Sequence, residues 1–316
     1  MEIVVHHWDA DGISSAAIVM KERGRLPAFT PPIGEFKFDP RIESGVYSSK
    51  LSYFIDLNMP EAVVDLANRG IISKAIFIDH HIQKPIKHEK IEYYNKPYPS
   101  ASFLVSELFN HESYLTVLGG VGDLGEKLFE VEDFGERAEK ILDIEGISKK
   151  EIIKAVKLVD CNHLTLDRYG VEEAVFYLLN AEIDDILSRD EWIEKLRDIE
   201  SEVSRIVKSA RIERGIARVE FYSPNSIISR VARELVWNKG AKACLAINRG
   251  FNGKYQVYLR ISKGNEKMKN LIEKLRLIGV NAGGKAEVLG SVFEGEDKLK
   301  LVVEEIEKFL NSEVVE

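Results

Sequence analysis

Short apolar runs with the character of β-strands alternate with helical segments over roughly the first 120 residues, and this alternation limits the fold more than any other feature. In chain order, the predicted strands and helices are 2–6, 13–21, 51–55, 60–67, 75–78 and 102–109. Alternation of this kind is typical of a mostly parallel sheet flanked by helices. The sequence therefore predicts an α/β fold for the N-terminal part of the chain.

The remaining sequence predicts a helical region followed by a second, smaller domain. The stretch 184–211 is long, charged and free of Pro and Gly, and we interpret it as a helix that connects two domains. After Gly215, predicted strands and helices alternate again, at 217–221, 227–237, 243–247, 255–261 and 266–277. We predict a catalytic α/β domain at 1–183, a linking helix at 184–214 and a smaller C-terminal α/β domain at 215–316.

Asp and His side chains gather at or just beyond the carboxyl ends of the predicted N-terminal strands. These features are His7-Trp8-Asp9-Ala10-Asp11-Gly12, Asp56, Asp79-His80-His81, and Asp123 at the end of a Gly-rich run. Open α/β sheets place their ligand sites at this edge, and alternate residues of an extended segment point the same way. A single Asp after a strand is usually a cap or turn residue, but four such strand ends together predict one functional site.

Carboxylates with a few imidazoles are the ligands that manganese or magnesium ions prefer. The only two cysteines, Cys161 and Cys244, lack metal-type spacing, which argues against a structural zinc site. Their apolar surroundings predict small buried side chains in a reducing cytoplasm. The N-terminus lacks the pattern of a signal peptide and no apolar run could span a bilayer, so we expect a cytoplasmic protein without a membrane partner.

The net charge of −8 conceals an uneven distribution. Residues 216–286 contain 14 Lys and Arg against 4 Asp and Glu, a local charge of +10, so the rest of the chain carries −18. Metal-binding carboxylates in one part and a basic surface for nucleic acid in the other would give this pattern, although a basic face made only for solubility is the alternative. Two Gln residues among many charged ones favour a heat-adapted source.

The four N-terminal features resemble the four motifs of the DHH phosphoesterase superfamily, over roughly the first 125 residues. That superfamily includes RecJ-type nucleases, short-oligonucleotide phosphodiesterases and family II pyrophosphatases. The resemblance implies that His7 and Asp9 hold one divalent ion and that Asp11, His80 and Asp123 hold another. The expected cofactor is a pair of Mn²⁺ ions, with Mg²⁺ as the alternative.

The resemblance also implies roles for the remaining residues of these motifs. Asp56 would bridge the two ions, Asp79 would orient an imidazole, and His81 would face the substrate phosphate. His6 lies outside the motif, and we interpret it as structural.

The C-terminal part resembles the DHHA1 substrate domain of the nucleic-acid-directed branch. The matching residues are Arg260-Ile261-Ser262 and Gly283-Gly284-Lys285, with Gly290 downstream. Paired glycines can present backbone N–H groups to a phosphate, and an arginine can bind one through two hydrogen bonds. The family usually has His at the position of Lys285, so substrate recognition is where this chain departs from the pattern.

Together these features predict a metal-dependent phosphodiesterase or exonuclease acting on single-stranded or short nucleic acid, with the 3′-to-5′ direction favoured. Alternatives within the superfamily are a cyclic-dinucleotide phosphodiesterase and a pyrophosphatase, although a pyrophosphatase should lack the C-terminal features. A replication or repair scaffold without activity is the alternative from another class, yet no metal ligand of the motifs is missing. A helicase or another replication or repair protein is the partner that the resemblance implies. The sequence does not distinguish DNA from RNA.

Overall fold

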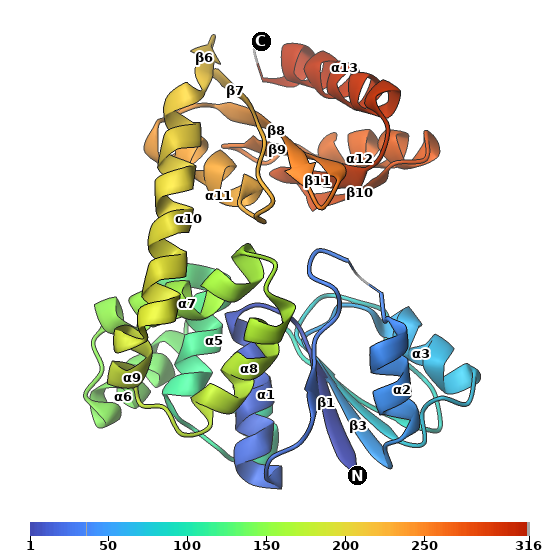
Figure 1. Cartoon of the computed structure of the whole chain (residues 1–316), viewed down its shortest axis with the longest axis vertical. Helices are drawn as coiled ribbons and strands as arrows, with labels where there is room; N and C mark the ends of the chain where they lie inside the picture. Colours follow the sequence, from blue (N-terminus) through green and yellow to red (C-terminus); the bar gives the residue numbers. More distant parts are fainter. Residues whose placement is uncertain (36, 315–316) are drawn as a thin grey trace. The chain divides into compact units, whose positions relative to one another are not determined.

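The computed structural model describes residues 1–35 and 37–314 and divides into two compact units (Figure 1). The first unit is Met1–Leu196 and the second is Arg197–Glu316. This division falls inside the segment 184–214 that the sequence predicts as a linker.

A five-stranded sheet organises the first unit, and all of its neighbouring strands run parallel. The strands are β1 (Glu2–His6), β2 (Ala28–Phe29), β3 (Leu51–Ile55), β4 (Ala75–Asp79) and β5 (Ile91–Asn95), in the order β2-β1-β3-β4-β5. This arrangement confirms the predicted parallel sheet with flanking helices. The sequence missed β5, whose residues follow a proline-containing loop.

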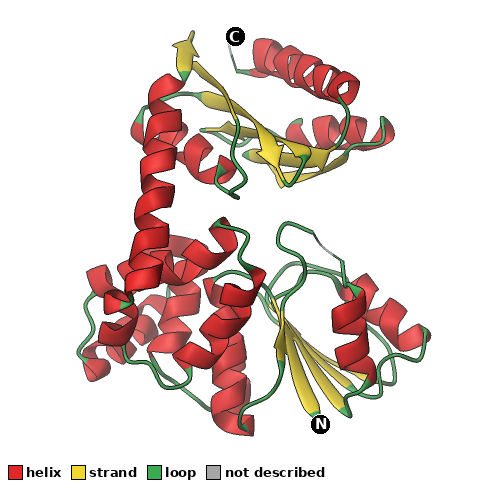
Figure 2. Ribbon diagram, viewed as in Figure 1, coloured by secondary structure: helices red, strands yellow, loops and turns green. Residues whose placement is uncertain are grey.

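Helices cover both faces of this sheet (Figure 2). One face packs on α2 and α3 through the alternate residues Ile3 and Val5 of β1 and Phe54 of β3, as the period of two requires. Helices α1 and α4 lie on the opposite face. The helices of the first unit are α1 (Ala10–Arg23), α2 (Pro40–Tyr47), α3 (Pro60–Asn68), α4 (Ala101–Phe109), α5 (Tyr114–Leu124), α6 (Phe134–Glu145), α7 (Lys149–Leu164), α8 (Arg168–Leu178), α9 (Ile183–Ser188) and the N-terminal part of α10 (Asp190–Ser209), with a 3₁₀ turn at Gly125–Glu130.

The Gly-rich run before Asp123 is helix α5, so the expectation of a strand there is wrong. Its glycines allow close packing on neighbouring elements. A Cβ atom on Gly119 would lie 2.3 Å from Ser102 Oγ and 2.5 Å from an oxygen of Asp11, and one on Gly122 would lie 3.1 Å from Ala10 Cβ. Tertiary packing therefore stabilises a helix in a segment of poor intrinsic helix propensity.

The predicted single helix over 184–211 is also wrong, because α9 and α10 are separated at Arg189. Arg189 has an extended backbone with ψ of 101°. Its guanidinium lies over the rings of Tyr177 and Trp192, at 4.3 and 4.4 Å from their centroids, and pairs with Glu173 at 3.0 Å. These contacts stabilise a bend that the local charge pattern does not reveal.

The second unit contains a six-stranded mixed sheet of order β10-β11-β9-β8-β7-β6. One face packs on α12 and α13, with Val257, Leu259 and Ile261 of β9 in the core. Helix α11 contacts β8 and β9. The elements are β6 (Arg211–Glu213), β7 (Ile216–Phe221), α11 (Ile228–Arg233), the π-helical turn η2 (Glu234–Asn238), β8 (Ala243–Phe251), β9 (Lys254–Ile261), α12 (Met268–Leu277), β10 (Asn281–Lys285), β11 (Val288–Phe293) and α13 (Glu296–Glu313).

No helix in the described part of the chain is both long and apolar enough to cross a lipid bilayer.

Candidate metal centre

The polar motifs lie at the point where the strand order of the sheet reverses. The chain passes from β1 to β2 on one side and then to β3, β4 and β5 on the other, so β1 and β3 are neighbours with diverging connections. Ligands of open α/β sheets bind outside the carboxyl ends of strands at such a point. His7 follows β1 and Asp56 follows β3, the central strand.

One group of potential ligands consists of His7, Asp9 and Asp56. His7 Nδ1 lies 2.7 Å from Asp9 Oδ2 and 3.7 Å from Asp56 Oδ2. Asp9 is also the N-cap of α1, where its Oδ1 accepts a hydrogen bond from the backbone N–H of Gly12 at 3.1 Å. A Cβ atom on Gly12 would lie 2.4 Å from the His7 carbonyl oxygen, so glycine permits this tight entry into the helix.

A second group consists of Asp11, His80 and Asp123. His80 Nε2 lies 3.0 Å from Asp123 Oδ2 and 4.0 Å from Asp11 Oδ2. The same nitrogen is 3.5 Å from Asp56 Oδ1. The two oxygens of Asp56 therefore face the two groups, with Oδ2 toward His7 and Oδ1 toward His80.

The backbone of Asp56 adopts an unusual conformation. Its φ angle is 60°, in the left-handed region that Asp and Asn enter more readily than other residues with a side chain. Its N–H donates to the carbonyl of Ile78 at 2.9 Å, which extends the pairing of β3 with β4 by one residue. Such backbone strain is often found at functional sites.

Hydrogen bonds from outside the motifs hold several of these groups in place. The carboxylate of Asp11 accepts the N–H groups of Ala101 and Ser102, at 2.6 and 2.8 Å, at the positive N-terminus of α4. His80 Nδ1 lies 3.1 Å from the carbonyl oxygen of Tyr98, which directs Nε2 toward the carboxylates. The side chain of Asp160 accepts the N–H of Ala10 at 2.9 Å.

The loop Asp79-His80-His81 is fixed from two sides. Asp79 accepts hydrogen bonds from the backbone and the imidazole of His81 and, through its other oxygen, from the N–H of Asn58 at 2.7 Å. Asn95, at the end of β5, donates to the carbonyls of Asp79 and His81 at 2.9 Å each. The missed strand thus provides a support for the motif. His6 is fully buried, with Nδ1 2.7 Å from the His7 carbonyl oxygen.

The site concentrates negative charge in a buried position. Burial, with a further contribution from Asp123, raises the pKa of Asp11 to about 7. Burial and the nearby Asp11 and Asp9 raise the pKa of Asp56 well above its usual value. Burial alone would lower the pKa of His80, but hydrogen bonds to Asp123 and Asp56 raise it to about 12. Buried like charges of this kind are stabilised by a bound cation, so the donor set fits a divalent metal pair.

The predicted substrate-binding residues lie in the second unit. Arg260 is in β9, and Ser262 follows that strand, with its N–H donating to the carbonyl of Lys242 at 2.8 Å. Gly283 and Gly284 lie within the edge strand β10, which Lys285 ends. Lys285 pairs with Val288 and Val288 with Arg260, so the two basic residues share one row across three strands.

No family model and no curated protein matches the chain, whereas several solved structures do. RecJ from Thermus thermophilus, in complex with Mn²⁺, aligns with a TM-score of 0.69 and 14% identity over 98% of this chain. The alignment covers 52% of that RecJ chain, so the present chain spans about half its length.

Two further structures align over 98% of this chain. The DHH domain of a protein assigned to a family of ribosomal proteins has a TM-score of 0.71 and 15% identity, with 86% of that chain covered. A pGpG-specific phosphodiesterase from Vibrio cholerae has a TM-score of 0.52 and 14% identity, with 99% covered. These likenesses show that the chain shares its fold with RecJ and with that DHH domain, as the resemblance of the motifs implied.

Proposed function

We propose that this chain with a DHH/DHHA1 fold is a metal-dependent phosphodiesterase that removes nucleotides from single-stranded or short nucleic acid. The observation that carries the proposal is the position of the Asp56 carboxylate. Its two oxygens lie 3.7 Å from His7 Nδ1 and 3.5 Å from His80 Nε2, between two groups of ligands. A carboxylate so placed can serve both groups at once.

The proposed cofactors are two divalent ions, manganese or magnesium. His7 and Asp9 would hold one, Asp11, His80 and Asp123 the other, and Asp56 both. When bound, such a pair lowers the pKa of a coordinated water toward neutrality. It also neutralises charge that develops on a phosphoryl group. The solved RecJ structures include complexes with Mn²⁺ and a complex with Mg²⁺, which supports this choice of ions.

His81 is the imidazole that we assign to the substrate. Its side chain is 35% exposed, against 16% for His7 and 12% for His80. Nδ1 of His81 is hydrogen-bonded to Asp79, so Nε2 is the nitrogen available to a phosphate oxygen. We propose that a hydrogen bond from His81 stabilises charge on the phosphoryl group as the phosphodiester bond breaks.

The basic segment of the second unit supports nucleic acid as the substrate. Arg260, Ser262, Gly283, Gly284 and Lys285 are the proposed phosphate contacts. RecJ is an exonuclease and the Vibrio protein is specific for pGpG, so two neighbours in fold act on nucleotide phosphodiesters. We further propose that digestion proceeds from the 3′ end. The proposed protein partner is a helicase or another replication or repair protein.

The decisive experiment follows the products of end-labelled oligomers. The protein is incubated with Mn²⁺ or Mg²⁺ and with DNA or RNA oligomers labelled at the 5′ end, and pGpG and pyrophosphate serve as competing substrate classes. A 3′-to-5′ exonuclease gives a ladder of progressively shorter labelled products, whereas digestion from the 5′ end releases the label at once. Cleavage of pyrophosphate alone, or of no phosphodiester with either ion, would refute the proposal.

A further inference from the structure

An exposed tryptophan lies in the basic part of the second unit, on the π-helical turn η2 that follows α11. The N–H of Lys239 donates to the carbonyl of Glu234 at 3.0 Å, which closes the wide turn. Leu235 and Val236 are buried, whereas Trp237 is 62% exposed. π-Helical turns are frequent at functional sites. The turn keeps two apolar residues in the core and exposes the third.

Two guanidinium groups accompany this indole. The Cζ atom of Arg260 lies 4.7 Å from the Trp237 ring centroid, and that of Arg233 lies 6.0 Å from it. Among residues 1–35 and 37–314, no carboxylate forms an ion pair with either arginine, and Arg260 Nε is buried without a hydrogen-bond partner. The two guanidinium charges are therefore not engaged in ion pairs within the described part of the protein.

A comparable pair elsewhere in the same unit shows the opposite arrangement. The guanidinium of Arg249 lies 5.5 Å from the ring centroid of Tyr255, but it pairs with Glu220 and, at 2.8 Å, with Glu296. The hydroxyl of Tyr255 also donates to Glu296 at 2.7 Å. Carboxylates thus pair with the arginine of one arginine–aromatic contact in this unit, whereas none in the described part of the chain pairs with the arginines beside Trp237.

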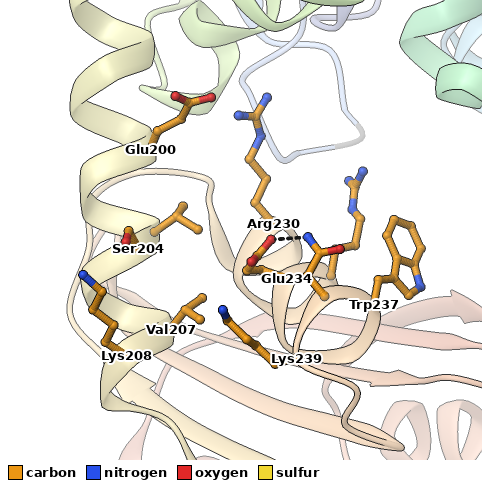
Figure 3. A pocket seen from close by; sticks show the side chains of 11 residues that line it. Glu200, Ser204, Val207, Lys208, Arg230, Glu234, Trp237 and Lys239 are labelled. Atoms are coloured by element: carbon orange, nitrogen blue, oxygen red, sulfur yellow. Dashed lines mark hydrogen bonds between the residues drawn. The ribbon is translucent and has the colours of Figure 1, made fainter.

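The surroundings of Trp237 suit a polyanion with flat apolar parts. Trp237 lines a pocket of about 350 Å³ between the C-terminal half of α10 and the segment α11–η2 (Figure 3). Lys208 and Lys239 line it as well, and neither forms an ion pair among the described residues. Glu200 and Glu234 contribute the negative charge of the lining.

We propose that Trp237, together with Arg233 and Arg260, forms a stacking site for one unpaired base of a nucleic acid. The identity of the ligand rests on the proposed function. Bases of any sequence can stack on an indole, and arginines beside it can bind the flanking phosphates. A duplex does not present its base faces, so the site selects single strands.

The test uses equilibrium binding in EDTA, where metal-dependent cleavage cannot interfere. Fluorescein-labelled oligothymidylate and an abasic oligomer of equal length, which has the phosphates without the bases, are titrated with each variant. Trp237→Ala should weaken binding of oligothymidylate about tenfold, or about 1.4 kcal/mol, and leave binding of the abasic oligomer unchanged. Trp237→Phe should restore most of the loss. Tyr222→Ala, which removes another exposed aromatic side chain of this unit, should change neither affinity.

Intrinsic fluorescence gives an independent measurement. Trp8 and Trp192 are buried, so stacking on Trp237 should quench the emission of the wild type and not that of Trp237→Phe. Equal losses for both oligomers, no loss for either, or a wild type that binds neither would overturn the stacking site. Because binding is measured without metal, a protein that stacks bases but cleaves none would refute only the proposed function.

Discussion

Asp79 Oδ1 accepts two hydrogen bonds from His81, one from its backbone N–H at 3.0 Å and one from its imidazole Nδ1 at 2.8 Å. The other oxygen of this fully buried carboxylate accepts the N–H of Asn58 at 2.7 Å. Burial alone would raise the pKa of Asp79, but the hydrogen bonds from His81 and Asn58 outweigh it and lower the pKa. Asp79 therefore stays ionised and fixes the direction of the His81 ring.

This relationship predicts the behaviour of Asp79→Asn. The amide has one oxygen, so its NH₂ group must face either His81 or the N–H of Asn58, and at least one hydrogen bond is lost. We expect kcat to fall by about 10- to 100-fold, as for other groups that orient residues around a metal, with a smaller change in KM. The measurement is steady-state hydrolysis of bis-p-nitrophenyl phosphate with Mn²⁺. An unchanged kcat in a variant with wild-type melting temperature would show that Asp79 does not position His81.

Substitution of Asp56 should separate activity from stability. Because burial and the neighbouring carboxylates raise its pKa, the buried position of Asp56 lowers the stability of the metal-free protein at neutral pH. Asp56→Asn removes the charge and tolerates the φ angle of 60°, whereas Asp56→Ala removes the charge but strains the backbone. In EDTA we expect Asp56→Asn to melt higher than the wild type, by about 2–4 °C for each kcal/mol gained, and Asp56→Ala to gain less.

Both variants should lose hydrolysis with Mn²⁺, since neither offers a carboxylate to the two ligand groups. Thermal melts in EDTA and turnover at saturating Mn²⁺ test the two halves separately. A variant that retained a tenth of wild-type turnover would exclude the bridging role.

Metal binding should release protons. Asp11, with a pKa of about 7, and His80, with a pKa of about 12, both hold protons more tightly in the folded chain than in the unfolded one. The stability that these protons provide is complete below the unfolded pKa values, about 4 and 6.5, and is lost as pH rises through the folded values. The metal-free protein should therefore be less stable at pH 8 than at pH 5.5.

Because bound Mn²⁺ must replace those protons, its apparent affinity and its effect on melting temperature should increase with pH. Calorimetric titration in two buffers of different ionisation enthalpy measures the protons released. Equal heats in the two buffers, with a Mn²⁺-induced shift that does not depend on pH, would contradict this account. An Asp11→Asn variant should release fewer protons than the wild type.

The sequence predicted the part of the site that local signals determine. His7 and Asp56 follow short apolar runs, and a parallel sheet necessarily brings such strand ends to one edge. Supports such as Asp160, which is 150 residues from its partner Ala10, leave no local signal. Helix α5 was missed because its glycines are required for close packing on Ser102 and α1, and such tertiary contacts leave no local signal.

The exposed indole of Trp237 was missed for a similar reason. In the sequence, an apolar residue next to Leu235 and Val236 resembles another core residue. Its side chain is exposed because the chain forms a π-helical turn there. In the second unit, the sequence predicted the positions of β7, β8 and β9 from their apolar residues, but it missed β6, β10 and β11. The row that joins Arg260 to Lys285 was not predictable, because it depends on strand register.

Lys285 is expected to contribute to nucleic-acid affinity through its charge alone. It is exposed, and its place at the end of β10 puts it in the same row as Arg260, where we propose that it binds a backbone phosphate and reads no base. Lys285→Ala should weaken oligomer binding by a similar factor for all sequences, and the slope of log K against log salt should become shallower by about one unit. Lys285→His should restore part of the affinity below neutral pH and lose it as the imidazole deprotonates, near its ordinary pKa of about 6.5. Salt titrations with two oligomers of unrelated sequence provide the measurement. Affinity unchanged at low salt in Lys285→Ala would mean that this lysine is only a solvated residue at the strand end, and a loss confined to one sequence would mean that it reads a base.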